Sequence, residues 1–246
     1  SLASGLTTLL VEPGEPIASV VVDGVTHSVE RVTDAERVQA ISAMVWSDDV
    51  LIADGHHRYS IARTYRDEVR ETTGSDDTPA ELTLTFVSEL VEEQLSVAAI
   101  HRVYRGISRV DLVAALSRSF EPWQIGTVGT QTLSEMEAQG YLCLVYPDGT
   151  GDWLMPREGA FDDVRALDGA WLEHALEGVD HEVSYQHGVQ EVLDLMRDDR
   201  SVTACVLIRP VSVAEIERTA REGLLMPPKS TFFTPKLRTG LVIREL

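Results

Sequence analysis

Five consecutive residues, Asp54, Gly55, His56, His57 and Arg58, carry the side chains of this sequence that are best suited to chemistry. Apolar residues precede them, and apolar residues at helical spacing follow them, so we predict a strand, a turn at Gly55 and a helix. The first turn of a helix presents unpaired backbone N–H groups and the positive end of a dipole. Acidic residues are usual there, so three basic ones indicate a bound phosphate or carboxylate.

Each residue of this cluster has a candidate role. Gly55, His56, His57 and Arg58 are candidate phosphate-binding residues, and His57 is also a candidate general base. Asp54 could bind a magnesium ion, orient His57 or cap the helix. A metal site formed by the two histidines is disfavoured, because adjacent helical residues diverge by about 100° and the His-x₃-His spacing is absent. A purely structural corner is the alternative, but packing alone gives little reason for three basic residues.

A second group of basic and hydroxyl side chains lies near the C-terminus, in a loop that three prolines restrict. Lys229, Ser230, Thr231 and Lys236 offer the ammonium and hydroxyl donors that bind phosphate oxygens. A solvated crossover loop is the alternative, because the Gly-rich loop of a Walker site is missing.

His101 and Arg102 end a predicted strand and could face the same pocket. His101 is therefore a further candidate general base, although a structural role is commoner for a single histidine at a strand end. Isolated basic clusters on an acidic chain point to a common anion. We therefore expect Arg58 and Lys229 to share one pocket.

The composition narrows the classes of partner. The formal net charge is −19, from 40 acidic and 21 basic residues, so the surface opposes binding to nucleic acid or anionic membranes. No apolar run approaches the roughly 20 residues that span a bilayer. Cys143 and Cys205 are far apart in apolar segments, which predicts buried thiols and a reducing, cytoplasmic compartment. The acidic excess suits a bacterial origin. The oligomeric state is not determined by these patterns.

Periodicity and turn signals predict strands and helices in both halves of the chain, without strict alternation, which indicates an α+β fold with a mixed sheet. A seam at residues 106–109 divides a first domain, 1–105, from a C-terminal α/β half, 106–246, and the two could pack as one unit. The predicted strands are 6–11, 18–29 with a hairpin turn at Asp23-Gly24, 50–52, 82–90, 95–104, 141–147, 152–155, 202–208 and 241–244. The predicted helices begin at a cap in 33–36 and at Gly55, and cover 111–120, 132–139, 168–177, 187–198 and 213–222.

Three segments resemble the domain of unknown function 1015 family in their order and separation: Ala-Asp-Gly-His-His-Arg-Tyr at 53–59, His101-Arg102, and residues 226–242. Members of that family usually carry a further N-terminal segment that this sequence lacks. We expect any catalytic group housed there to be absent, and residues 1–246 alone to be a poor kinase.

The Asp-Gly-His-His-Arg element is also similar to the phosphate-binding corner of the ParB/sulfiredoxin superfamily. There, a strand, a glycine-containing turn and a basic helix start hold nucleotide phosphates, and the free serine kinase branch is similar around this motif. The acidic surface opposes the DNA-binding branch. His56 stands where the sulfiredoxin branch has its cysteine, which opposes that chemistry.

The resemblance implies a nucleotide, ATP or ADP, with Mg²⁺. Arg58 and the backbone amides of 55–58 would hold the phosphates, Lys229 and Lys236 would neutralise charge in transfer, and Asp54 would lie near the metal. The resulting hypothesis is a nucleotide-phosphate-binding protein that acts as a kinase on a small hydroxylated metabolite. The alternative is a non-catalytic ligand-binding or scaffold protein that senses a nucleotide or an acidic metabolite.

Overall fold

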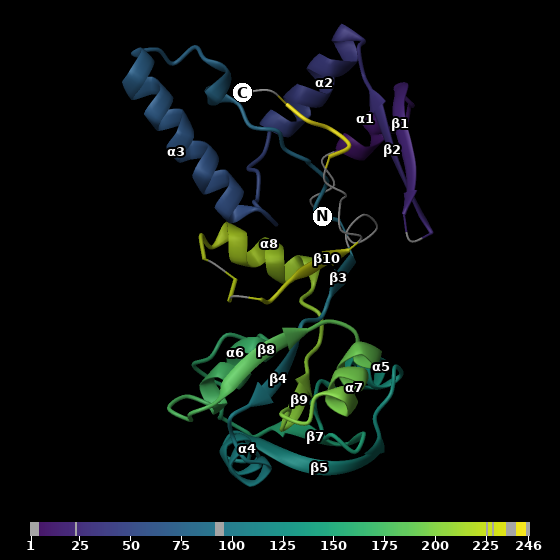
Figure 1. Ribbon diagram of the computed structural model, residues 1–246, viewed down its shortest axis with the longest axis vertical. Coiled ribbons are helices and arrows are strands. Elements are labelled where there is room, and N and C mark those ends of the chain that lie inside the picture. Colours follow the sequence, from purple (N-terminus) through teal and green to yellow (C-terminus); the bar gives the residue numbers. More distant parts are fainter. Residues whose placement is uncertain are drawn as a thin grey trace. The chain divides into compact units, whose positions relative to one another are not determined.

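The computed structural model describes residues 5–22, 24–91, 96–224, 226–227, 229–234 and 240–244. The chain forms two compact units. The first comprises Ser1–Gln94 and Pro235–Leu246, and the second comprises Leu95–Thr234. In Figure 1 the first unit begins in purple, and the second runs from teal to yellow-green.

The first unit opens with a short helix and a β-hairpin. Strands β1 (Glu15–Val22) and β2 (Val25–Arg31) pair antiparallel, with a register shift between Pro16 and Ala18. Gly24 takes a φ of +76° in the connecting turn. The hairpin predicted from the Asp-Gly pair is therefore confirmed.

Two longer helices follow, and both were predicted. Helix α2 (Ala35–Trp46) begins at Asp34, whose carboxylate accepts a hydrogen bond from the Arg37 amide at 2.8 Å. Helix α3 (His56–Thr73) begins directly after Gly55 and ends at Gly74. The 3₁₀ turn η1 (Pro79–Glu81) follows it.

The segment predicted as a strand over 6–11 is helical instead, as α1 (Leu6–Leu10). The amides of Leu6 and Thr7 donate to the carboxylate of Glu89, at 3.0 and 3.1 Å. These are helix-start N–H groups, which need an acceptor from elsewhere in the chain. The prediction of a strand over 6–11 was wrong, because periodicity does not distinguish a short apolar strand from a short helix.

Three further predicted strands are also wrong, because none of residues 50–52, 82–90 or 241–244 lies in a strand. For residues 82–90 and 241–244, part of the reason is a contact made by the Arg244 side chain. Arg244 donates its guanidinium hydrogens to the carbonyls of Pro79 and Leu82, at 3.1 and 2.5 Å. An apolar run forms a strand only where a partner strand is available, so its β-propensity is decided by context.

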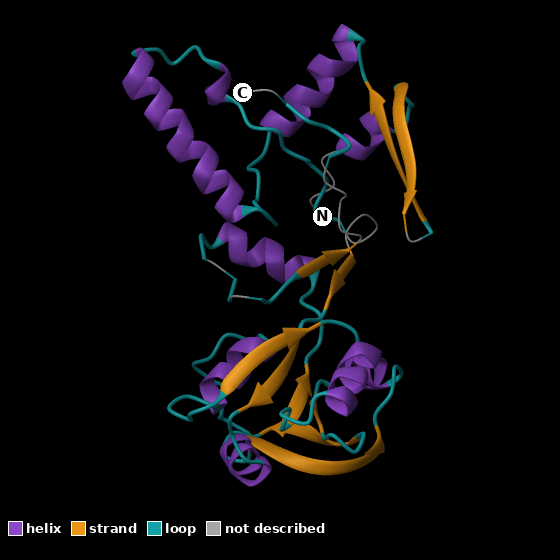
Figure 2. Ribbon diagram, in the orientation of Figure 1, coloured by secondary structure: helices purple, strands orange, loops and turns teal. Residues whose placement is uncertain are grey.

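The second unit is built on a six-stranded sheet in the order β5-β7-β6-β9-β4-β8, covered by helices on both sides (Figure 2). Every pairing among the described residues is antiparallel, where a mixed sheet was expected. The α+β class itself is confirmed. The elements of the unit are β3 (Ser96–Ala98), β4 (His101–Arg105), α4 (Arg109–Leu116), β5 (Phe120–Thr127), α5 (Thr132–Gln139), β6 (Leu142–Val145), β7 (Thr150–Pro156), α6 (Asp168–Ala175), β8 (Glu182–Gln186), α7 (Val189–Asp198), β9 (Ala204–Leu207), α8 (Val213–Arg221) and β10 (Phe232–Thr234).

The buried core lies in this second unit, in two layers that the sheet separates. Leu142 and Leu144 of β6 pack in the layer of α4 and α6. Cys143 and Val145 of the same strand pack in the layer of α5 and α7. Because successive strand residues point to opposite faces, a strand covered on both sides is apolar throughout. Both cysteines are buried free thiols, as predicted.

Strands β5 and β8 were not predicted, and they are the two edge strands of the sheet. β5 contains Pro122 and Gly126, which weaken a strand signal, and most of its residues are exposed. β8 is short, and most of its residues are exposed as well. Edge strands carry no continuous apolar run, so their sequences resemble loops.

The division into units differs from the expected boundary after residue 105. β4 ends at Arg105 and pairs with both β8 and β9, which come later in the chain. The six-stranded sheet therefore holds β4 in the second unit, and the chain returns to the first unit at Pro235.

Candidate functional site

The start of α3 places the Arg58 guanidinium directly over the backbone of Gly55. A Cβ at Gly55 would lie 3.0 Å from Arg58 Nη2 and 3.1 Å from its Nε. Gly55 also takes a φ of +89°, in the left-handed region that favours glycine. Two independent constraints, the backbone conformation and the close guanidinium, therefore call for glycine at this position.

The backbone of this turn presents donors to solvent. The first hydrogen bond of the helix runs from the Tyr59 amide to the Gly55 carbonyl at 2.9 Å, so the amides of residues 56–58 precede the helical hydrogen-bond ladder. The helix has no side-chain cap and no acidic residue in its first turn. His56, His57 and Arg58 are all exposed. This exposed turn combines backbone N–H groups with three basic side chains, which suits an oxyanion.

Asp54 is the acidic residue of this turn. Its Oδ2 lies 3.4 Å from Arg58 Nη2, and both side chains are largely exposed. The contact keeps the guanidinium near the helix start, although an exposed pair of this kind contributes little to stability.

A magnesium ion would find few protein ligands here. No cluster of three or more His, Cys, Asp or Glu side chains suited to a metal occurs among the described residues. Asp54 is a single carboxylate already in contact with Arg58. Mg²⁺ in such sites is held by one or two carboxylates together with phosphate oxygens of the substrate, so the magnesium role of Asp54 stays a prediction.

A shallow hollow lies along α3, next to the basic turn at residues 55–58. Its lining includes Tyr59, Ser60, Arg63, Thr64 and Asp67. The Tyr59 side chain is 45% exposed and directly follows Arg58 in sequence. An exposed aromatic ring of this kind can stack on a nucleobase.

The second group of predicted site residues lies in the other unit. Lys229 is exposed and takes a φ of +57°, which is rare for a residue with a side chain. Ser230 is buried, and Thr231 is half-buried. Lys236 lies outside the described residues. Because the two groups belong to different units, the shared pocket expected for Arg58 and Lys229 stays a prediction.

His101 is buried, and its Nδ1 accepts a hydrogen bond from the Ile208 amide at 3.2 Å. Burial, with the charges of Arg102 and His187 nearby, lowers the pKa of His101 to about 4. A neutral imidazole whose Nδ1 is already an acceptor is a poor general base. His57 is exposed, and its role as a general base stays a prediction.

His101 and Arg102 were expected to face one pocket, and the sheet separates them. Arg102 pairs across the sheet with Val206, which packs in the layer of α6. Val103 follows on the opposite face, and the alternation places His101 on that face as well. Sequence reasoning treated the two residues as a pair, whereas strand geometry assigns them to different surroundings.

The fold defines an α+β protein of two units, whose first unit carries a basic helix start. The chain belongs to the family described as protein of unknown function (DUF1015), whose model matches residues 2–170. That range includes the Asp-Gly-His-His-Arg turn and His101-Arg102, and it ends before residues 226–242. No curated protein matches the chain. None of the described helices is long and apolar enough to cross a bilayer.

Several solved structures are similar to the chain at low identity. A conserved hypothetical protein from Pyrococcus furiosus is 12% identical, with a TM-score of 0.45 over 74% of this chain and 68% of that one. A free serine kinase in complex with AMP is 14% identical, with a TM-score of 0.44 over 82% of this chain and 81% of that one. A variant of free serine kinase in complex with ADP is 13% identical, with a TM-score of 0.44 over 74% and 66% of the two chains.

Proposed function

We propose that this protein binds a nucleotide by its phosphates at residues 55–58, and that the bound ATP donates a phosphoryl group to a small hydroxylated metabolite in the cytoplasm. The observation that carries the proposal is the guanidinium of Arg58 held over Gly55 at the exposed start of an 18-residue helix. A planar guanidinium can bind two phosphate oxygens at once. The amides of residues 56–58 add donors in the same direction.

The nucleoside would lie along the outer face of α3. The hollow beside the helix start is lined by Tyr59, Ser60 and Arg63, among others. Tyr59 would stack on the base, while Ser60 and Thr64 offer hydroxyl groups to a ribose. A site of this kind distinguishes a nucleotide from free phosphate, because only the nucleotide reaches both the turn and the hollow.

In the transfer step, the hydroxyl oxygen of the metabolite forms a bond to the γ-phosphorus of ATP, and the bond from that phosphorus to the β,γ-bridging oxygen breaks. ADP leaves, and the hydroxyl proton passes to the His57 imidazole. Arg58 would stabilise the negative charge on the transferred group. Mg²⁺ bound by the nucleotide phosphates would supply further positive charge, with Asp54 as the nearest protein carboxylate on this turn.

Binding is tested by calorimetry of the full chain with AMP, ADP, ATP and inorganic phosphate, each with and without Mg²⁺. Arg58→Gln removes one charge-assisted pair and should weaken ADP and ATP binding about tenfold to a hundredfold. Arg66→Gln is the matched control, because Arg66 lies on the same helix and pairs with Asp67. Equal affinity of the wild-type protein and the Arg58→Gln variant would refute the phosphate site.

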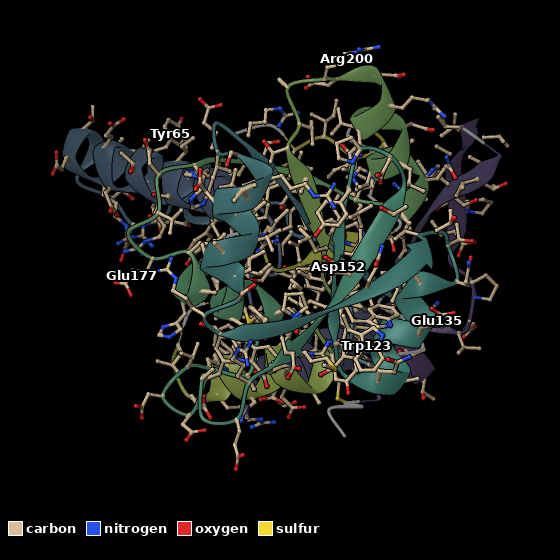
Figure 3. All side chains as sticks on the ribbon, turned by 90° about the horizontal axis from the view of Figure 1, so that it is seen from below. Tyr65, Trp123, Glu135, Asp152, Glu177 and Arg200 are labelled. Carbon is tan, nitrogen blue, oxygen red and sulfur yellow. The ribbon has the colours of Figure 1, made fainter. Side chains whose placement is uncertain are left out.

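A second pair of variants tests whether Tyr59 contacts the nucleoside part of ATP. Tyr59→Ala should weaken ATP binding and leave the binding of inorganic phosphate unchanged. Tyr65→Ala is the control, because Tyr65 lies on the same helix and is not part of the hollow's lining (Figure 3). If Tyr59→Ala weakens phosphate and ATP equally, the ring supports the turn and does not contact the base.

A kinase is distinguished from a non-catalytic nucleotide-binding protein by measuring ADP release with a panel of hydroxylated metabolites. A kinase forms ADP only when an acceptor is present, and His57→Gln should lower that rate about 10²- to 10⁴-fold. A protein that senses a nucleotide binds ATP with the same Arg58 dependence and forms no phosphorylated product with any acceptor.

A further inference from the structure

The second unit contains a buried arginine with part of its guanidinium unpaired. Arg102 is 3% exposed. Its Nη1 donates to the carbonyls of Ile100 at 2.5 Å and of Lys229 at 3.1 Å. Its Nη2 is buried and has no hydrogen-bond partner among the residues that the structure describes. Buried polar groups almost always have a partner, so an orphan guanidinium nitrogen requires an explanation.

The charge of Arg102 is also uncompensated. Among the residues that the structure describes, no ion pair joins Arg102 to a carboxylate. Asp168, the acidic residue in the first turn of α6, is engaged by Arg209 through both of its carboxylate oxygens. A guanidinium cannot lose its proton at physiological pH, and an unpaired buried charge is strongly unfavourable. A counter-anion from outside the chain would supply the missing partner.

The orphan nitrogen points at the first turn of α6. A Cβ at Gly169 would lie 2.7 Å from Arg102 Nη2. The helix has no side-chain cap, and its first backbone hydrogen bond runs from the Trp171 amide to the Leu167 carbonyl at 3.0 Å. The amides of residues 168–170 precede that bond and so are not used by the helical hydrogen-bond ladder. Only glycine at position 169 leaves the guanidinium this close to the helix start.

Two exposed residues lie next to the Arg102 guanidinium. The Tyr185 ring lies 5.1 Å from the Arg102 guanidinium and is 39% exposed. Lys229, whose carbonyl binds Arg102, is exposed. The Tyr185 ring is therefore the exposed side chain that a small ligand would pass to reach the guanidinium.

We propose that the second unit binds a small oxyanion, a phosphate or a carboxylate, between Nη2 of Arg102 and the first-turn amides of α6. A planar guanidinium and helix-start amides are matched to these oxygens in geometry and charge. Nη1 is occupied by two carbonyls, which fixes the guanidinium in place before the ligand arrives. The site lies in a different unit from the turn at residues 55–58, so it stands or falls independently of the proposed function.

The experiment uses the full chain with Arg58→Gln as background, which removes the phosphate site of the first unit. Inorganic phosphate and acetate are titrated separately while the arginine guanidinium ¹H–¹⁵N resonances are recorded, so the two arms distinguish the two classes of oxyanion. Arg102→Met is added to that background to remove the charge at similar volume. Arg200→Gln is the control, because Arg200 is an exposed arginine of the same unit (Figure 3).

We expect one arginine resonance to shift with phosphate or acetate, and the added Arg102→Met substitution to weaken that binding at least tenfold, with no change from Arg200→Gln. If neither anion shifts a guanidinium resonance, or if Arg102→Met leaves the affinity unchanged, Arg102 is only a clamp for two carbonyls. If Arg102→Met does not fold, the titration of the Arg58→Gln protein decides between these outcomes. Arg102→Lys then serves to assign the Arg102 guanidinium resonance in that titration.

Discussion

Arg209 encloses the carboxylate of Asp168 with three hydrogen bonds. Its backbone amide donates to Oδ2 at 2.7 Å, its Nε donates to Oδ2 at 3.1 Å, and its Nη2 donates to Oδ1 at 2.5 Å. The Asp168 side chain is 7% exposed. This pair joins the start of α6 to the chain just after β9, and it holds in place the helix turn that contacts Arg102.

The first prediction concerns this pair. Asp168→Asn keeps the shape of the side chain but removes its charge and one acceptor, which leaves the half-buried guanidinium of Arg209 poorly paired. We expect the free energy of unfolding to fall by about 2–4 kcal/mol, measured by urea denaturation. Asp194→Asn breaks the exposed pair with Arg197 and should cost less than about 1 kcal/mol. Equal losses in the two variants would contradict this ranking.

A second prediction uses the two glycines that flank α3. Gly55 and Gly74 both have positive φ, at +89° and +66°, so alanine at either position costs about 1 kcal/mol in backbone strain. Only at Gly55 would the added Cβ meet Arg58. We therefore expect Gly55→Ala to weaken nucleotide binding, measured by calorimetry, and Gly74→Ala to leave it unchanged. A loss of affinity in both variants would show that helix stability, and not the Arg58 position, controls binding.

A third prediction follows from the lowered pKa of His101. Its folded-state pKa is about 4, below the unfolded value of about 6.5, so the unfolded chain binds more protons between these two values. The contribution of His101 to stability is therefore complete above about pH 6.5 and is lost as the pH falls toward 4. It amounts to at most about 3 kcal/mol.

The measurement is urea denaturation at pH 7 and at pH 5. His101→Gln should reduce the loss of unfolding free energy between these two pH values, because the variant has no imidazole to protonate at this position. His27→Gln is a control in the exposed hairpin strand β2. An identical pH dependence in wild type and His101→Gln would contradict the assignment.

A fourth prediction concerns the core layer under α4 and α6. Leu144 is fully buried there, and Leu144→Ala should lower the free energy of unfolding by about 2–5 kcal/mol through lost burial and a new cavity. Leu224→Ala removes the same atoms from a side chain that is 54% exposed, and it should change stability by under about 1 kcal/mol. Comparable losses would mean that Leu144 does not lie in the core that unfolds cooperatively.

The helices and central strands could be read from the sequence because their signals are local. Asp34 caps α2, Gly55 begins α3 and the apolar runs of β6 and β9 mark a sheet covered on both faces. The basic turn at residues 55–58 was also predicted, since helix start, glycine and basic side chains are all neighbours in sequence.

The errors fall where the outcome depends on a distant partner. Residues 6–10 form a helix whose first amides are bound by Glu89, and the carbonyl of Leu82 is taken by Arg244. The edge strands β5 and β8 exist because a neighbouring strand pairs with them. None of these partners is visible in a window of a few residues.

The sequence by itself determined that the chain carries a basic helix start, two buried thiols and an α+β pattern, because periodicity, turn chemistry and charge act over short distances. Only the tertiary structure decided that His101 and Arg102 lie on opposite faces of a sheet. It also buries Arg102 against Gly169 and leaves one guanidinium nitrogen without a partner in the described part of the chain. Burial of a charge is set by which segments cover it, and here those segments, α6 and the Lys229 turn, are about 65 and 125 residues away in sequence.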